Sequence, residues 1–127
     1  MKRIAIVGSR DFKTLDLIPQ WLEFAREKYE KEHGGLVVVS GGARGVDKTA
    51  ENWAITNKVN RDIFMPEWNQ QGKKAGAIRN KKIVENADVI LAFWNEESPG
   101  TEITLNYAKK MNKPCIIIME DGFWKHW

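Results

Sequence analysis

The stretch LVVVSGGARGVD, residues 36–47, shows most directly how this chain folds. It begins with a run of aliphatic, mostly β-branched residues, which is typical of a strand buried on both faces of a sheet. Glycines end that strand, and a helical pattern of apolar residues begins at Val46. A strand that passes through a short loop into a helix predicts a parallel sheet with helical crossovers.

The same alternation of strand and helix signals continues on both sides of this stretch. Apolar runs predict strands at 2–7, 36–40, 62–65, 89–94 and 114–119. Helical spacing of apolar residues predicts helices at 15–33, 46–57, 73–86 and 101–111. We therefore expect an α/β fold with a doubly wound, parallel five-stranded sheet and helices on both faces. The aromatic tail, 121–127, carries no clear strand or helix signal.

Length and composition indicate one globular domain over residues 1–127. The chain has the usual length of a single domain, and its 43% hydrophobic and 29% charged residues exclude the disordered and fibrous classes. No apolar run approaches the roughly 20 residues that span a membrane. The apolar stretch after the first three residues is too short for a signal peptide. We expect a cytoplasmic protein with no membrane partner.

Charge and rare residues narrow the chemistry. The net charge of +3 favours anionic partners, but basic and acidic residues are interleaved, so nucleic acid is not singled out. A single cysteine, Cys115, excludes an internal disulfide. Two histidines and one cysteine offer neither a metal cluster nor a Ser-His-Asp or Cys-His arrangement. We expect no metal and no cofactor, and electrostatic binding as the main chemistry of a site.

Three loops should meet at one edge of the predicted sheet. In doubly wound sheets, ligands bind outside the carboxyl ends of the strands, where the strand order reverses. The segments that follow the first, second and fourth strands are 8–11 (GSRD), 41–45 (GGARG) and 95–101 (NEESPGT). They are rich in glycine and in small polar or basic residues. The sequence therefore predicts a shared crevice.

The loop 41–45 leads directly into a helix. Its glycines let the backbone approach a ligand closely, and free amides at a helix start favour anions. Arg44 would add a bidentate contact to a phosphate, and Asp47 would accept from a ribose hydroxyl or form an ion pair. The spacing fits neither GxGxxG nor GxxxxGK[ST], so a tight glycine turn without a ligand stays an alternative.

The loop 8–11 carries the same kinds of residue. Ser9 either donates to a phosphate oxygen or caps a turn. Arg10 either contacts the ligand or pairs with Asp11 or Asp47. The sequence leaves both pairs of alternatives open.

The segment SPGTE offers a second anion site at a helix start. Gly100 allows close approach, and the Thr101 hydroxyl joins the first-turn amides. An ordinary N-cap by Ser98 or Thr101 is the alternative.

The segment KKAGAIRN precedes the fourth strand. Arg79 and Asn80 are adjacent on a helix, so they point about 100° apart and at most one should face a ligand squarely. A solvated arginine is the alternative. Trp68 and Trp94 lie near strand ends, where an aromatic face stacks on a base or packs in the core.

These motifs together resemble one known family. They are GSRDF, SGGARGVDKTAENWA, PEW with GKKAGAIRN, ADVILAFW and SPGTEITLNYA. In this order and at this spacing they are similar to the SLOG superfamily (SMF/DprA–LOG), and most of all to its YspA-like, cpYpsA-related branch of small single-domain proteins. The likeness runs from about Ile4 to Pro114.

The resemblance implies a Rossmann-like fold that binds nucleotides or nucleotide-derived ligands. Members of the superfamily include LOG enzymes, which cleave the N-glycosidic bond of nucleoside monophosphates, DprA-type proteins, which bind single-stranded DNA, and nucleotide sensors of bacterial and phage conflict systems. A homodimer or higher homo-oligomer is implied as well. The matched ligand-binding positions are Gly8, Ser9, Arg10, Gly41, Gly42, Arg44, Gly45, Asp47, Arg79, Asn80, Gly100 and Thr101.

One departure from the LOG pattern bears on catalysis. LOG enzymes are similar to one another in PGGxGTxxE, whose final glutamate acts with an arginine. Here Thr104 stands at the glutamate position, while Arg79 stands at the arginine position. Glu102 is two residues away, which rotates it by about 200° on a helix. The catalytic pair of a hydrolase would be Arg79 and Glu102.

The favoured function is therefore binding rather than cleavage. The expected partner is a phosphate-bearing nucleotide-like small molecule, such as an ADP-ribose-like molecule, a nucleoside monophosphate or a signalling nucleotide, with the protein as sensor or carrier. A LOG-like phosphoribohydrolase and a single-stranded nucleic-acid binder are the alternatives.

Overall fold

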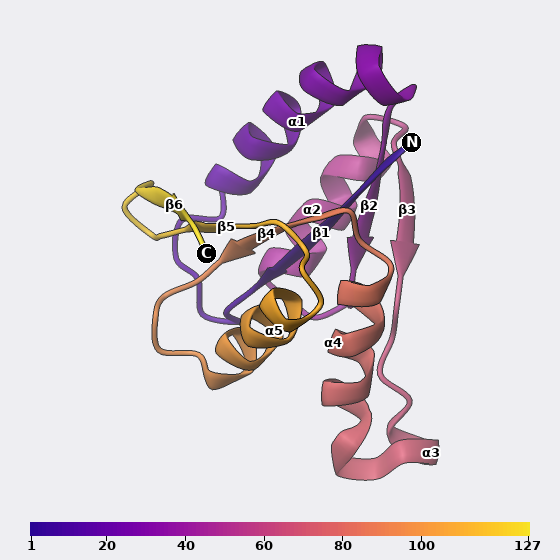
Figure 1. Ribbon diagram of the computed structural model, residues 1–127, viewed down its shortest axis with the longest axis vertical. Coiled ribbons are helices and arrows are strands. Elements are labelled where there is room, and N and C mark those ends of the chain that lie inside the picture. The colour runs from indigo at the N-terminus through magenta and orange to yellow at the C-terminus, as the bar shows by residue number, and fades with distance from the viewer.

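A computed structural model describes residues 1–127 and confirms the Rossmann-like α/β fold (Figure 1). One six-stranded sheet has the order β3-β2-β1-β4-β5-β6. Its strands are β1 (Lys2–Gly8), β2 (Leu36–Ser40), β3 (Asn60–Ile63), β4 (Val89–Phe93), β5 (Cys115–Ile118) and β6 (Trp124–His126). The helices are α1 (Leu17–His33), α2 (Val46–Thr56), α3 (Trp68–Gln71), α4 (Ala75–Glu85) and α5 (Pro99–Lys110), with a 3₁₀ turn, η1 (Gly72–Lys74), before α4.

The sheet is covered on both faces, as predicted. A buried cluster that includes Ile18 of α1 and Ala50 of α2 packs on one face. A second cluster with Val84 of α4 and Leu105 of α5 packs on the other. Strands β1 to β5 are parallel, and β1 lies between β2 and β4. The strand order therefore reverses at β1 and β4, which places the expected ligand edge at the ends of these two strands.

The expectation of five strands is wrong, because the aromatic tail adds a sixth. Strand β6 pairs antiparallel with β5, and Gly122, at φ +90°, provides the turn between them. Its three residues are too few for an alternation of polar and apolar side chains to be read. Trp124 packs edge-to-face on Trp21, at 5.7 Å between ring centroids, and Trp127 packs likewise on Trp94, at 6.2 Å.

Two predicted boundaries also differ. The third strand spans 60–63 rather than 62–65, and the segment predicted as one helix from 73 is divided. The short helix α3 precedes it, and Gly72, at φ +57°, is the C-cap of α3 and the first residue of η1, where the helical path is interrupted. None of the helices combines the length and the apolar character that a membrane crossing requires.

Candidate functional site

An open cavity of about 590 Å³ lies at the ends of β1 and β4, where the strand order reverses. Its volume falls in the range of small-molecule sites. The loop after β1, the segment that begins α5, helix α4 and Trp68 of α3 form its walls. The predicted site residues that line it are Gly8, Ser9, Arg10, Asp47, Arg79, Asn80, Gly100 and Thr101.

The other predicted site residues lie outside this cavity. They are Gly41, Gly42, Arg44, Gly45 and Glu102. The side chains of Arg44 and Glu102 are exposed. Thr104 is buried and lines the cavity in place of Glu102. The two side chains therefore point to different sides of α5, as the helical rotation between positions 102 and 104 predicts.

The loops after β1 and β4 are joined by Ser9 and Asn95. Ser9 is 1% exposed; its Oγ donates to Asn95 Oδ1 at 3.0 Å and accepts from the Asn95 amide at 3.2 Å. Asn95 Oδ1 also accepts from the amides of Glu97 and Ser98, at 2.9 and 3.0 Å. The Ser9 hydroxyl is thus engaged within the protein. Asn95 begins the segment 95–101 predicted to line the crevice, but it was not among the predicted ligand-binding residues, because its only signal was its place directly after a strand.

Helix α5 begins at this junction with one open amide, that of Gly100. Ser98 is the N-cap: its Oγ accepts from the Thr101 amide at 3.4 Å and from Thr101 Oγ1 at 3.2 Å, and its carbonyl oxygen accepts from the Glu102 amide. The amides of Arg10 and Asp11, in the loop after β1, also have no acceptor within the chain. A free amide at a helix start favours an anion. All three residues with free amides line the same cavity.

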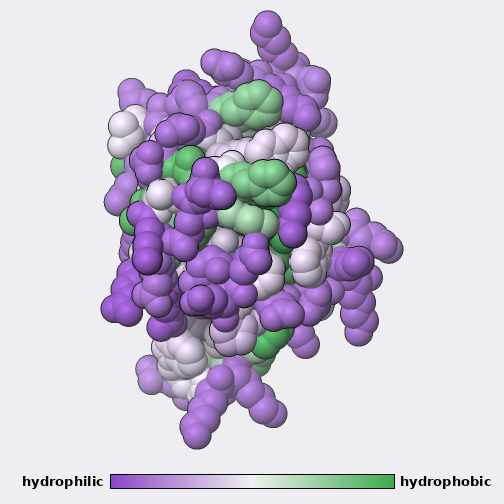
Figure 2. Space-filling view, turned by 90° about the vertical axis from the view of Figure 1, so that its left-hand side faces the viewer, coloured by the Kyte–Doolittle hydropathy of each residue, from purple (hydrophilic) through white to green (hydrophobic).

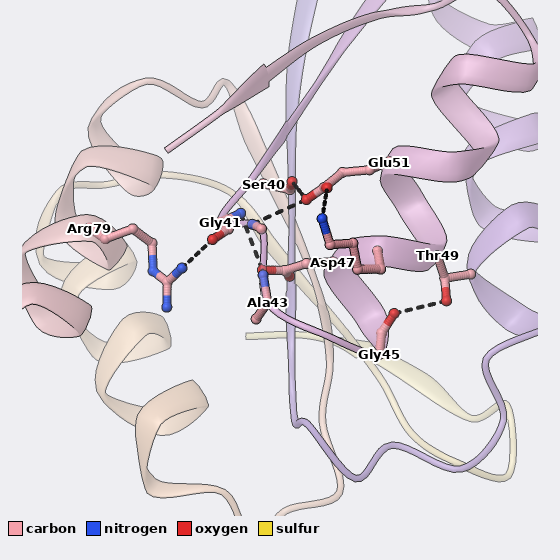
Figure 3. Close-up of polar contacts among 10 residues, drawn as sticks. Ser40, Gly41, Ala43, Gly45, Asp47, Thr49, Glu51 and Arg79 are labelled. Atoms are coloured by element: carbon pink, nitrogen blue, oxygen red, sulfur yellow. Dashed lines mark hydrogen bonds and ion pairs between the residues drawn. The ribbon is translucent and has the colours of Figure 1, made fainter. Parts of the chain in front are cut away.

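The glycine loop 41–45 is different, because its own helix supplies carboxylates to it (Figure 3). The amides of Gly41 and Ala43 donate to Asp47 Oδ2, at 3.2 and 3.1 Å. The amide of Gly42 donates to Glu51 Oε2 at 3.1 Å. Three consecutive donors of the predicted phosphate loop are therefore satisfied inside the protein. We call this segment the closed loop.

The surroundings of Asp47 change the pKa of its carboxyl group. Burial raises its pKa to about 6, although the hydrogen bond from the Ala43 amide and the charge of Arg79 act in the opposite direction. The negative charge of Glu51 contributes to the rise. Asp47 lines the cavity, but its Oδ2 already accepts two amides.

Arg79 reaches the closed loop from α4. Its Nη1 donates to the Gly41 carbonyl oxygen, and its Nε donates to Asn80 Oδ1 at 2.8 Å. A Cβ on residue 41 would lie 2.5 Å from Nη1, so glycine is needed there for the guanidinium to approach. Both Arg79 and Asn80 line the cavity, and the long arginine side chain folds back beside its neighbour; which of the two faces a ligand stays a prediction.

The two arginines that line the cavity, Arg10 and Arg79, have no carboxylate within ion-pair distance. The ion pairs of the chain involve neither Arg10 nor Arg79. Burial lowers the pKa of Arg79, and the charge of Arg10 lowers it further, against the charge of Asp47. Two guanidinium groups that repel each other at one cavity are suited to an anionic ligand.

Comparisons with known proteins agree with this fold. A model of the YspA, cpYpsA-related SLOG family matches residues 2–71, more than half of the chain. The chain is also 39% identical over 122 residues to the Gene 61 protein of Mycobacterium phage D29, across 91% of this chain and 95% of that protein. The chain therefore belongs to the YspA, cpYpsA-related SLOG family.

Solved structures share the fold at low sequence identity. A protein designated TM1055 has a TM-score of 0.68 at 21% identity, over 91% of this chain and 72% of that one. DprA from Streptococcus pneumoniae gives 0.68 at 21%, over 94% and 50%. DprA from Helicobacter pylori, described for its single-stranded DNA binding mode, gives 0.69 at 21%, over 92% and 65%. The chain thus spans about half to two thirds of the DprA chains.

Proposed function

We propose that this chain binds a phosphate-bearing nucleotide or nucleotide-derived small molecule in the cavity at the ends of β1 and β4, as a sensor or carrier. The observation that carries the proposal is the pair Arg10 and Arg79, which line one cavity without a carboxylate at ion-pair distance. A half-buried guanidinium without an acidic partner gains most from an anionic ligand.

The walls around the arginines support the same chemistry. The free amides of Arg10, Asp11 and Gly100 add donors for phosphate oxygens. The carboxylates of Asp11 and Glu97 also line the cavity and would accept from ribose hydroxyls. Membership of the SLOG family supports a nucleotide-derived ligand.

A thermal-shift panel tests the proposal directly. It contains AMP, ADP-ribose, NAD and cyclic nucleotides, each with inorganic phosphate as the control for a non-specific anion effect. A ligand at 100 times its dissociation constant adds about 2.7 kcal/mol to the free energy of unfolding. We expect at least one nucleotide to stabilise the protein well beyond phosphate. If no member of the panel does so, the proposal is wrong.

Cleavage of the ligand receives less support. Glu102 is exposed and lies outside the cavity, while Thr104 occupies the inner position. Asp47 is a carboxylate of the cavity whose charge affects the pKa of Arg79. Its Oδ2, however, already accepts hydrogen bonds from two amides of the closed loop. Incubation with nucleoside monophosphates, followed by chromatography for free base, distinguishes a hydrolase from a binding protein.

Single-stranded nucleic acid is the second candidate. The fold shared with DprA, together with the exposed side chains of Arg10, Arg44 and Trp68, supports it, because cations and an aromatic face bind a strand. Affinity for an oligonucleotide that falls steeply with salt, by a slope of about 0.7 per phosphate contacted, would favour this candidate. If a mononucleotide displaces the oligonucleotide, the two ligands bind in the same cavity.

The homodimer or higher homo-oligomer stays a prediction. Phe123 and Trp124 are 60% and 49% exposed. Figure 2, which views the side on which β6 lies, shows green and pale side chains gathered among the polar ones. Exposed apolar groups of this kind often mark an interface. Sedimentation velocity over a range of protein concentrations measures the oligomeric state.

A further inference from the structure

The elements that line the cavity differ in chemistry. The loop 8–11 and the start of α5 contribute the side chain of Arg10 and free amides, which favour phosphate. The start of α4 contributes Gly76 and Ala77, against which Trp68 lies; these residues offer no charge, and we call this part of the cavity the uncharged end. A ligand that carries only phosphate and sugar would leave the uncharged end unfilled.

Trp68 is the largest side chain of the uncharged end. Its indole is 53% exposed, although it lines a cavity. A Cβ on residue 76 would lie 3.6 Å from Trp68 Cη2, so the glycine lets the ring lie close against the start of α4. The indole is thus supported from one side by the helix while much of its surface stays open. Such a ring is suited to stack on another planar ring.

Asn80 adds a hydrogen-bond donor one helical turn away from Gly76. Its Oδ1 accepts from Arg79 Nε, so the oxygen of the side-chain amide faces the arginine and the nitrogen, Nδ2, faces away. Its Nδ2 has no acceptor within the chain, and the residue lines the cavity. Positions four residues apart lie on the same face of a helix. A donor beside the uncharged end would meet the acceptor atoms of a ring or of the sugar that joins ring and phosphate.

We propose that Trp68 stacks on the base of the ligand, with the phosphate at Arg10, Arg79 and the start of α5. This inference rests on the proposed function and narrows it: the ligand class is a phosphate that carries an aromatic base, and sugar phosphates are poor ligands. Trp68 is then the residue that determines specificity for the base.

Calorimetric titration of the full chain with three probes tests the inference. AMP and UMP carry a base, and ribose 5-phosphate lacks it. We expect the nucleotides to bind the wild-type chain about 5- to 150-fold more tightly than ribose 5-phosphate, the range that one base–aromatic stack provides. Trp68→Leu should remove most of that advantage and leave ribose 5-phosphate binding unchanged, whereas Trp68→Phe should retain much of it.

Two further measurements keep the outcomes distinct. Trp124→Leu removes an equally exposed indole outside the cavity and should leave all three affinities unchanged. Circular dichroism checks that each variant is folded. If ribose 5-phosphate binds as tightly as the nucleotides, or if Trp68→Leu weakens all three probes alike, the stacking role is wrong and the phosphate site stands. If none of the three probes binds the wild-type chain, the stacking role is wrong, and the proposed function is wrong only if the whole nucleotide panel fails as well.

Discussion

Two loops of this molecule end a parallel strand and begin a helix at the same edge of the sheet, but their backbone amides meet acceptors of different charge. In the closed loop, 41–45, the helix that follows turns the carboxylates of Asp47 and Glu51 back onto the amides. In the loop 95–101 the acceptors are neutral: Asn95 Oδ1 accepts from the amides of Glu97 and Ser98, Ser98 Oγ accepts from that of Thr101, and the Gly100 amide stays open. The difference shows that glycine content does not make an anion site. The charge of the side chains that accept from a loop decides whether a further anion is welcome there.

Removal of Glu51 should have the largest effect, because it opens the closed loop. Its carboxylate is buried and accepts from Ser40 Oγ and the Gly42 amide. Glu51→Ala leaves two donors without an acceptor, and each costs about 1–3 kcal/mol. We expect the free energy of unfolding in urea to fall by about 2–4 kcal/mol. Glu102→Ala, the matched control at an exposed position of α5, should change it by less than about 0.5 kcal/mol.

Asp47 should make the closed loop sensitive to pH. Burial raises its pKa from 3.8 to about 6, so the native state binds this proton more tightly than the unfolded chain does. As pH rises from about 4 to 6, the contribution of this group to stability therefore falls, by on the order of 2–3 kcal/mol, and it is constant above that range. Asp47→Asn does not titrate. Urea unfolding of both proteins at several pH values measures the difference, and a constant difference from pH 4 to 7 would contradict the raised pKa.

Two arginines compare the cavity with the closed loop through ligand binding. Arg79→Gln should weaken AMP binding about 10- to 150-fold, since a hydrogen bond to a charged group is worth about 1.5–3 kcal/mol. Arg44→Gln removes the same charge from the closed loop, where the side chain is exposed and outside the cavity. It should change the affinity less than about threefold. Equal losses in calorimetry would mean that net charge, rather than the placement of Arg79, drives binding.

A substitution at Ser98 can introduce a carboxylate into the loop 95–101, like those of the closed loop, with the smallest expected effect on the free energy of unfolding. Ser98→Ala should cost about 1 kcal/mol as a lost N-cap. Ser98→Asp keeps a good cap and suits the helix dipole, so the free energy of unfolding should change little. It also places a carboxylate beside the open amides, and AMP affinity should fall. Unchanged affinity in Ser98→Asp would mean that the ligand does not approach the start of α5.

The succession of strands and helices along the chain and the edge that holds the cavity could be predicted, because both depend on patterns that extend over many residues. The aliphatic run 36–40 and the helical stripe after Val46 identify a buried strand and its crossover without tertiary information. The reversal of strand order then fixes the ligand edge. Strand β6 could not be predicted, because its three residues form a strand only through pairing with β5.

The use of each polar group within the site could not be predicted. Asp47 and Glu51 stand four residues apart and therefore on one face of α2, but the sequence does not say whether a loop amide meets a ligand or one of these carboxylates. That depends on how closely α2 folds back over its loop. Ser9 and Asn95 are 86 positions apart, so their hydrogen bond depends entirely on the pairing of β1 with β4.

The packing of Trp127 on Trp94 has a spectroscopic consequence. Trp94, directly after β4, donates from Nε1 to the carbonyl oxygen of Ser98, the N-cap of α5. Trp127, directly after β6, donates from Nε1 to the carbonyl oxygen of Leu105, farther along the same helix. The two packed indoles are therefore bonded to two different turns of α5. A ligand that draws the start of α5 toward its phosphate would move one indole against the other. Ligand binding would then change the intrinsic emission of this pair as well as that of Trp68, although neither ring of the pair lines the cavity.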